Sequence, residues 1–372
     1  MSDSVALVTV EDIARAYDFG ASHPLRPERV LLTYDHIAEL RLTGPPHVEE
    51  ITSRSATDAE VLAVHDRDFV QTVQGIDSGE LDERKGLEFG LGTPDDPIFA
   101  NMHRAASAVC GASITAAEAV ATGRVRHAFN PAGGLHHARR REASGFCIYN
   151  DPAVAIAKIL DLHPDWRVMY VDVDVHHGDG VQWIFYDEPR VLTVSLHESG
   201  RYLYPGTGFE DEIGSGDAQG TSANVPLQPF TGDEDYLWAL ERTVRGLAEA
   251  FRPHVLFTQL GADTHHGDPL ANLGLTMRAF PEMARILHAA AHDFTSDGWV
   301  ATGGGGYQAT TVVPIAWTIY FAEMCGRPDV IPAEWLEDRP SEEVSKSYRD
   351  ELERSVDRVL DSCVKRLAAL AG

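Results

Sequence analysis

Short apolar runs that end in polar or glycine-rich residues recur through the second half of the chain. Four of them occupy residues 168–175, 191–196, 255–260 and 299–302. Runs of this length, bounded by turn-forming residues, are typical of strands buried on both faces. The segments between them carry apolar residues at helical spacing, as in 233–251. The alternation predicts an α/β fold with a central, mostly parallel sheet flanked by helices.

The remaining patterns add helices and loops but no second domain. Asp151-Pro152 suits the N-cap and first position of a helix. Residues 341–370 carry an apolar stripe and no Gly or Pro, so we expect a C-terminal helical segment, about 340–370, packed on the outside. Residues 53–96 are polar enough to form mostly surface loops and short helices. We therefore expect a single domain over residues 1–372.

A dense group of acids and imidazoles ends the first of the four strands. Asp172, Asp174 and His176 alternate with valines, so an extended chain puts the three polar side chains on one face. Carboxylates held this close repel each other unless a cation or hydrogen-bond donors compensate their charge. A solvated loop with incidental acids is the alternative, but a buried type of strand leads into this group. The pattern predicts a metal site at the carboxyl edge of the sheet.

A second pair of imidazoles, His136 and His137, follows Gly133-Gly134 and a short apolar run at 125–129. Glycines let the backbone turn sharply beside the two rings, and adjacent histidines suggest proton transfer. Taken alone, so short a motif is more often a surface pair. The neighbouring motifs favour the chemical interpretation.

Composition excludes several classes of protein. The formal net charge of −26 opposes contact with a phosphate backbone, so we expect no direct nucleic-acid binding. The four cysteines form no CxxC pair, which argues against a disulfide framework and favours buried free thiols. The N-terminus has no basic region, and the apolar stretch 312–322 is too short to span a bilayer. We expect a soluble, cytoplasmic protein with no membrane partner, and the sequence leaves its oligomeric state open.

Six motifs occur along the chain in the order found in one enzyme family. They are GGLHHA (133–138), ASGFCIYND (143–151), VDVDVHHGDGV (171–181), YPGTG (204–208), LGAD (260–263) and GGGGY (303–307). With these motifs the chain resembles the zinc-dependent histone deacetylase family, from about His23 to Tyr307 and beyond. GGLHHA together with GFCxxND is closer to the class I and acetoin-utilization branch than to class II enzymes. The resemblance implies an arginase/deacetylase-like fold with the active site in loops at the carboxyl ends of the strands.

The resemblance also implies a metal-dependent hydrolase and gives individual residues their roles. Asp174, His176 and Asp263 would bind the catalytic Zn2+, or Fe2+ in cells, and leave positions for water and substrate. Spacing alone suggests Asp172 as a further ligand. In the family, the matching aspartate instead pairs with the first histidine, here His136.

The acid that matches Asp179 pairs with the second histidine, His137, and each pair orients an imidazole and tunes its basicity. His137 would act as the main general base and later as the acid, with His136 in electrostatic support. Tyr307 matches the family tyrosine whose hydroxyl stabilises the oxyanion. A core aromatic is the alternative for Tyr307, but the four glycines before it weaken a fold unless the backbone there must be permissive.

A narrow tunnel suited to an acetylated lysine is implied as well. Its two aromatic walls match Phe146 and Tyr204. Tyr204 departs from the Phe of class I members, and its hydroxyl either narrows the tunnel, adds a donor or points to solvent. Leu270 would lie at the rim. Further substrate-binding positions match Gly145, Gly305 and an aspartate that grips backbone amides, for which Asp95 ranks slightly ahead of Asp96.

Relatives of this kind also bind a structural potassium ion and carry an internal cavity. The potassium (K+) positions match Asp172, Asp174, His176, Ser195 and Leu196. Arg29 matches an arginine that lines a cavity thought to handle acetate. His265 and His266, a pair that better-known eukaryotic relatives lack, are interpreted as surface or rim residues. For this pair, solvent-facing positions, substrate contact and adventitious metal binding all stay open.

These features predict the removal of acetyl, or other short acyl, groups from lysine side chains of an acetylated protein or peptide. Deacetylation of small molecules such as acetylpolyamines is the enzymatic alternative, although no gatekeeping glutamate is identifiable. A catalytically silent acyl-lysine-binding protein is the alternative of another class, but the ligands, the general base and the tyrosine are all present. A two-metal ureohydrolase would need ligands that these motifs do not supply. The native metal and the physiological substrate stay open.

Overall fold

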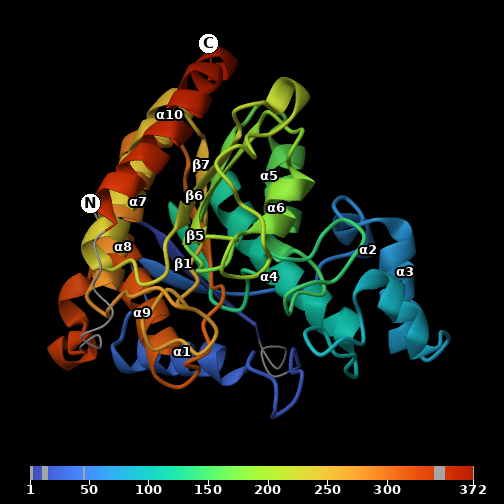
Figure 1. Ribbon diagram of the computed structural model, residues 1–372. Helices are drawn as coiled ribbons and strands as arrows, with labels where there is room; N and C mark the ends of the chain where they lie inside the picture. Colours follow the sequence, from blue (N-terminus) through green and yellow to red (C-terminus); the bar gives the residue numbers. More distant parts are fainter. Residues whose placement is uncertain (1–2, 11–15, 45–46, 339–347, 372) are drawn as a thin grey trace.

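Parallel strands form the centre of the molecule (Figure 1). The structure is a computed structural model that describes residues 3–10, 16–44, 47–338 and 348–371. Within them, eight strands make one sheet of order β2-β1-β3-β8-β7-β4-β5-β6, and every neighbouring pair is parallel. The strands are β1 Val5–Thr9, β2 Val48–Thr52, β3 His127–Asn130, β4 Val168–Asp172, β5 Val191–Glu198, β6 Ser222–Leu227, β7 Val255–Gln259 and β8 Gly298–Thr302. The predicted parallel α/β architecture is confirmed.

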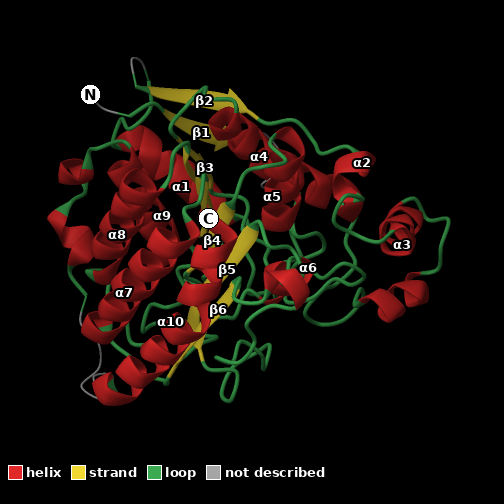
Figure 2. Ribbon diagram, turned by 90° about the horizontal axis from the view of Figure 1, so that it is seen from above, coloured by secondary structure: helices red, strands yellow, loops and turns green. Residues whose placement is uncertain are grey.

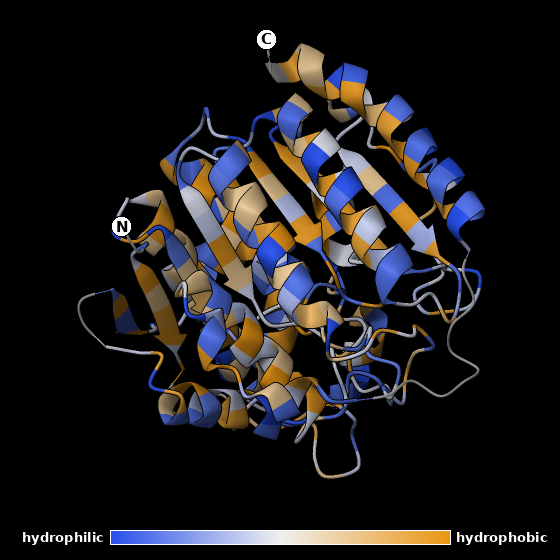
Figure 3. Cartoon of the chain, turned by 90° about the vertical axis from the view of Figure 1, so that its left-hand side faces the viewer, coloured by the Kyte–Doolittle hydropathy of each residue, from blue (hydrophilic) through white to orange (hydrophobic). Residues whose placement is uncertain are grey.

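Helices cover both faces of the sheet (Figure 2). One layer consists of α1 Glu28–Glu39, α7 Asp233–Phe251, α8 Ala279–Phe294, α9 Val312–Met324 and α10 Arg349–Ala371. The other contains α4 Met102–Ala121, α5 Asp151–Leu162 and α6 Asp179–Ile184, with α2 Asp58–Val61, α3 Arg67–Asp77 and the 3-10 helix η1 Glu83–Phe89 farther out. Polar residues lie on the outward faces of the first layer, and the strands behind it are mostly apolar (Figure 3).

The sheet divides the core into two clusters, one under each helical layer. Along β4, Met169 and Val171 belong to the cluster beneath α7 and α8, whereas Val168 and Tyr170 belong to the cluster beneath α4 and α5. All five residues of β4 are buried. Burial on both faces explains why this strand reads as a continuous apolar run instead of an alternating one.

The strand predicted over 168–175 is three residues shorter in the structure. The strand β4 ends at Asp172, because two backbone N–H groups beyond it bond to carboxylates instead of to a neighbouring strand. Asp174 N–H donates to Asp172 Oδ1 (3.1 Å), and Val175 N–H donates to Asp263 Oδ1 (2.9 Å). The valine alternation nevertheless persists, since Val173 and Val175 stay fully buried in the same core cluster as Val171. Alternation therefore continues after the sheet ladder has ended.

Other predicted elements also have counterparts. The helix predicted over 233–251 is α7. Residues 53–96 form loops, two short α-helices and η1. The C-terminal helix begins at Arg349 and packs against α7 and β6. Residues 340–347 of the predicted segment lie outside the described residues. All four cysteines are buried free thiols, as predicted. Each helix in the described ranges is too short or too polar to cross a bilayer.

The start of α5 is one residue earlier than predicted and ties the fold to the histidine pair. Asn150, not Asp151, is the N-cap, and its Oδ1 accepts from Ala153 N–H (3.0 Å). The Asn150 Nδ2 group donates to the carbonyls of His136 and Ala138 at 3.0 and 2.9 Å. Asp151 accepts from Leu135 N–H at 2.8 Å. The cap of α5 thus also holds the backbone of the GGLHHA loop.

We expect Asn150→Ala to lower the free energy of unfolding by about 2–4 kcal/mol, because it removes a helix cap and the donor to the buried Ala138 carbonyl, while the His136 carbonyl keeps only its bond from Val181 N–H. Urea unfolding followed by circular dichroism measures this. Thr57→Ala is the matched control, since Thr57 caps the exposed helix α2 and bonds only within its own capping box, and should cost about 1 kcal/mol. Equal losses in both variants would contradict this role of Asn150.

Candidate active site

Three potential metal ligands converge at the carboxyl edge of the sheet. Asp174 and His176 lie in the loop after β4, and Asp263 lies in the loop after β7. His176 Nδ1 is 3.1 Å from Asp174 Oδ1 and 3.2 Å from Asp263 Oδ2. Both aspartates are fully buried and His176 is nearly so. The structure brings together the three residues that the resemblance assigns to the metal.

The surroundings of this trio leave one oxygen of each carboxylate facing the imidazole. Asp174 Oδ2 accepts from Gln259 Nε2 and from Gly305 N–H, each at 2.7 Å. Asp263 Oδ1 accepts from Val175 N–H. Burial and the neighbouring Asp174 raise the pKa of Asp263 to about 7. Two carboxylates and one imidazole that need a shared positive charge fit a divalent zinc or iron ion.

Gly305 is required at this place by space. A Cβ on residue 305 would lie 2.1 Å from Asp263 Oδ2 and 2.6 Å from Asp174 Oδ2. The backbone of the glycine run therefore approaches the carboxylates more closely than any side chain would allow. This contact, and not substrate binding, is what the structure shows for Gly305.

The two histidines of GGLHHA form parallel pairs with two aspartates. His136 Nδ1 is 2.7 Å from Asp172 Oδ2, and His137 Nδ1 is 2.7 Å from Asp179 Oδ1. The two Nε2 atoms are 3.1 Å apart. Since each Nδ1 must donate to a carboxylate, one Nε2 donates to the other, and the two rings share three protons. One imidazole is therefore charged, and the other is neutral and accepts this hydrogen bond with its Nε2 lone pair.

The surroundings of the two pairs differ in charge. The carboxylate of Asp179 also accepts from Arg139, whose Nη2 is 2.9 Å away, while the carboxylate of Asp172 accepts from the neutral hydroxyl of Tyr170 at 2.6 Å. Arg139 thus neutralises the partner of His137 but leaves the partner of His136 with its full charge.

The two imidazoles differ accordingly. Burial lowers the pKa of His137 to about 4, and the neighbouring His136 adds to this effect. For His136, burial also opposes protonation, but Asp172 and Asp174 outweigh it and raise its pKa to about 9. His136 carries the shared charge, and His137 is the neutral member of the pair.

Aromatic rings line the approach to these groups. The rings of Phe146 and Tyr307 meet edge to face at 5.7 Å, and the ring of Tyr204 lies 5.1 Å from that of His137. The Tyr204 hydroxyl is 2.5 Å from the Ser144 hydroxyl. This contact ties the partly exposed Tyr204 to the loop that carries Phe146, and the three interpretations of the Tyr204 hydroxyl stay open.

Gly145 lets that loop pass beside the histidines. It has φ +55°, and a Cβ there would lie 2.4 Å from Cδ2 of His137. Phe146 itself has φ 71°, in the left-handed region that non-glycine residues rarely adopt. The Tyr17 hydroxyl donates to the Phe146 carbonyl (3.0 Å) and accepts from Ile148 N–H. These bonds hold the aromatic wall in its unfavourable backbone conformation.

The rim residues are exposed. Leu270 and Tyr204 are 37% and 42% exposed. Asp95 is exposed, whereas Asp96 is buried and its pKa is raised to about 8 by burial and by Asp95. The Asp95 carbonyl lies 3.2 Å from His23 Nε2, and the His23 ring contacts the Phe146 ring. Of the two aspartates, Asp95 is the exposed one.

Arg29 lines a cavity on the inner side of the site. Its guanidinium is buried, donates to the Gly306 carbonyl (3.1 Å) and packs over Trp317. The same cavity is lined by His136, His137 and Tyr307. Arg29 is thus a buried cation behind the two histidines, as expected from the resemblance, and the structure does not test a role in acetate release.

The positions expected to bind potassium lie beside the metal trio. Asp172 of β4 is in register with Ser195 of β5, followed by Leu196. The Ser195 hydroxyl is 2.8 Å from His197 Nδ1. Potassium binding at Asp172, Asp174, His176, Ser195 and Leu196 stays a prediction.

Of the three alternatives left open for His265 and His266, a solvent-facing position is wrong for His265. That residue is buried, and both His265 Nε2 and His266 Nε2 contact the Asp338 carboxylate, at 2.6 and 3.2 Å. Asp338 also accepts from Met277 N–H. Because Asp338 is 73 residues from His265 along the chain, the sequence alone gave no partner for this pair. The two histidines hold a loop near Asp263 to the segment after α9.

Several residues of the site were not identified from the sequence. Gln259 ends β7 and bonds to Asp174, Arg139 bonds to Asp179, and Asp268 accepts from the backbone N–H groups of Tyr307 and Leu270 at 2.8 and 2.9 Å. Arg139 had a usable signal, because three consecutive arginines follow GGLHHA in an acidic chain. Gln259 and Asp268 had none, since a polar residue at a strand end or in a loop is unremarkable in sequence.

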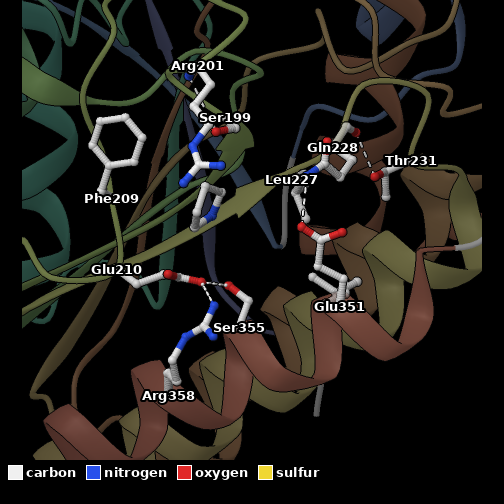
Figure 4. A pocket seen from close by; sticks show the side chains of 12 residues that line it. Ser199, Arg201, Phe209, Glu210, Leu227, Gln228, Thr231, Glu351, Ser355 and Arg358 are labelled. Carbon is white, nitrogen blue, oxygen red and sulfur yellow. Dashed lines mark hydrogen bonds and ion pairs between the residues drawn. The ribbon is translucent and has the colours of Figure 1, made fainter.

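A second pocket lies between the loop after β5 and α10 (Figure 4). Glu210 is bonded there to Ser355 and Arg358. None of its lining residues belongs to the metal trio or to the histidine pairs. The chemistry-bearing residues are therefore at the carboxyl edge of the sheet and not in this pocket.

Comparison with known proteins agrees with this arrangement. The histone deacetylase domain family matches residues 23–324. The acetoin utilization protein AcuC of Bacillus subtilis is 44% identical over 338 residues, covering 90% of this chain and 86% of that protein. AcuC of Staphylococcus aureus is 34% identical over 342 residues, covering 90% and 87%.

Two solved structures share the fold over nearly the whole chain. A crystal structure of an HDAC homolog complexed with SAHA has a TM-score of 0.82 at 30% identity, covering 96% of this chain and 100% of that one. An HDAC homolog from Aquifex aeolicus has a TM-score of 0.81 at 29% identity, with the same coverage. On the family match and the AcuC identity together, the chain belongs to the histone deacetylase family.

Proposed function

We propose that this protein is a metal-dependent hydrolase that removes acetyl groups from lysine side chains of a protein or peptide. The observation that carries the proposal is the placement of two His–Asp pairs beside a buried Asp–His–Asp trio, behind aromatic walls. A divalent zinc or iron ion held by Asp174, His176 and Asp263 would polarise the amide carbonyl and favour ionisation of the attacking water.

The chain's own residues supply the proton transfers. His137, the neutral member of the histidine pair, takes a proton from the attacking water at Nε2 and later gives it to the departing lysine nitrogen. His136 stays charged and stabilises the developing negative charge. The Tyr307 hydroxyl donates to the carbonyl oxygen as it becomes an oxyanion. Burial, with Asp263 nearby, holds the pKa of Tyr307 well above its usual range, so this hydroxyl keeps its proton.

Substrate selection follows from the walls and the rim. Phe146 and Tyr204 would enclose the lysine methylenes, while the exposed Asp95 carboxylate would accept from backbone amides that flank the lysine. The buried Arg29 would attract the acetate product into the inner cavity. A potassium ion bound near Asp172 and Ser195 would stabilise the loop that carries the metal ligands.

Hydrolysis of an acetyl-lysine peptide by zinc- or iron-loaded protein tests the activity. His137→Ala should lower kcat by about 100-fold to 10,000-fold because it removes the general base. Tyr307→Phe should lower it by about 100-fold or more, because it removes one oxyanion donor. Both variants should keep the metal content of the wild type, which separates lost chemistry from a lost site. Undiminished turnover in either variant would refute its assigned role.

Peptide and small-amide substrates are distinguished at Asp95. Asp95→Ala should raise KM for the peptide about tenfold, because a charged hydrogen bond to the substrate backbone is lost. It should leave N-acetylputrescine unaffected, since that molecule has no flanking backbone amides. Asp187→Ala is the matched control for the loss of one exposed carboxylate after α6. If wild-type protein hydrolyses N-acetylputrescine faster than the peptide, the substrate is a small amide. If it hydrolyses neither substrate, an acyl-lysine-binding role is favoured.

A further inference from the structure

A second group of histidines lies at the edge of the sheet opposite the active site. His127 is the first residue of β3, and its neighbour in the adjoining strand, Trp299, lies near the start of β8. Asp3 precedes β1. His288 and His292 are one turn apart near the end of α8. Three separate elements thus bring three imidazoles and one carboxylate to the amino edge of the sheet.

The four side chains face a common point. One oxygen of Asp3, Oδ2, lies 3.1 Å from His292 Nε2, 3.5 Å from His127 Nε2 and 3.9 Å from His288 Nε2. The Nε2 atoms of His288 and His292 are 3.0 Å apart. One ligand atom from each residue lies within 4.8 Å of all the others. Four ligands at about 2.0–2.1 Å from a tetrahedral ion lie about 3.3 Å from one another, so small adjustments suffice.

Within the described part of the chain, no hydrogen bond satisfies the ring nitrogens of His127. Its side chain is fully buried, and among the described residues neither of its ring nitrogens has a hydrogen-bond partner. Buried polar atoms are nearly always paired, so an unpaired ring aimed at a carboxylate and two further imidazoles needs an explanation. A metal ion would take the lone pair of His127 Nε2.

The ring of His288 is oriented as a metal ligand would be. Its Nδ1 is 3.1 Å from Glu323 Oε1, a carboxylate on α9. This contact fixes the proton on Nδ1 and leaves the Nε2 lone pair directed at the cluster. A carboxylate on the far nitrogen is the usual partner of a histidine that binds zinc. The spacing of His288 and His292, four residues apart on a helix, places both rings on one face.

We propose that Asp3, His127, His288 and His292 bind one divalent transition-metal ion, with zinc as the best match, in a closed site with four protein ligands. Three imidazoles and one carboxylate fill the tetrahedral shell of zinc, which leaves no position for a substrate and makes the site structural. The ion would fasten the segment before β1 to β3 and α8. This site is independent of the proposed function, since it shares no residue with the active site.

Metal stoichiometry tests the proposal on the full chain after removal of metal with a chelator. Asp263→Asn removes a ligand from the active site, so that variant should still bind one equivalent of Zn2+ with a rise in the unfolding temperature. Adding His288→Ala and His292→Ala should abolish both the binding and the rise. His47→Ala is the control for the loss of a histidine, because His47 is exposed and belongs to none of the groups that could hold a metal, and it should change neither.

Visible absorption of bound Co2+ reports the coordination geometry of the proposed site at Asp3, His127, His288 and His292. Loading the Asp263→Asn protein with Co2+ should give the strong visible absorption of a tetrahedral site with nitrogen and oxygen ligands. The proposal is overturned if this protein binds no metal, if its Co2+ absorption is the weak one of a six-coordinate ion, or if the His288/His292 variant keeps the equivalent. If the wild type binds a single equivalent of metal and Asp263→Asn abolishes that binding, the second site is overturned and the proposed function stays intact.

Discussion

Two carboxylates buried beside one imidazole are the constraint on which the active site depends. Asp174 and Asp263 are completely buried, and each directs one oxygen at His176. Ionised carboxylates without water are costly unless positive charge compensates them. The fold fixes the opposite oxygens with donors from Gln259, Gly305 and Val175, so the remaining two cannot turn away from each other. A divalent cation at this point would compensate the charge of both carboxylates.

The parallel sheet explains how this group is assembled. The loops after β4, β7 and β8 leave the same edge, and the GGLHHA loop after β3 joins them. Its two histidines contact carboxylates at the end of β4 and at the start of α6. Arg139 makes the two pairs unequal by sharing Asp179. The proposed general base therefore differs from its neighbour through charge and not through distance, because both His–Asp contacts are 2.7 Å long.

The sequence predicted those parts of the fold and site that have a local pattern. Apolar runs placed β4, β5, β7 and β8, but β1, β2 and β6 were not predicted. Helical spacing placed α7, whose bounds agree with the prediction. Family motifs placed the trio and both histidine pairs. Predictions failed where bonds between distant parts of the chain determine the structure. The strand β4 ends earlier than predicted, and Asp263, from a distant loop, accepts from the backbone after it. His265 is buried where its ring contacts Asp338. Asn150 and not Asp151 caps α5, because the carboxylate of Asp151 accepts from Leu135 N–H in the GGLHHA loop.

The most direct test of the account is metal-dependent hydrolysis of an acetyl-lysine peptide, measured as Zn2+ or Fe2+ is returned to chelator-treated protein. Wild type and Asp174→Asn are compared, with bound metal determined in the same samples. The account predicts that wild-type activity appears as metal fills a site that Asp174→Asn lacks, and that the variant stays inactive at every metal concentration. Full activity in the metal-free wild type, or metal-restored activity in Asp174→Asn, would contradict it.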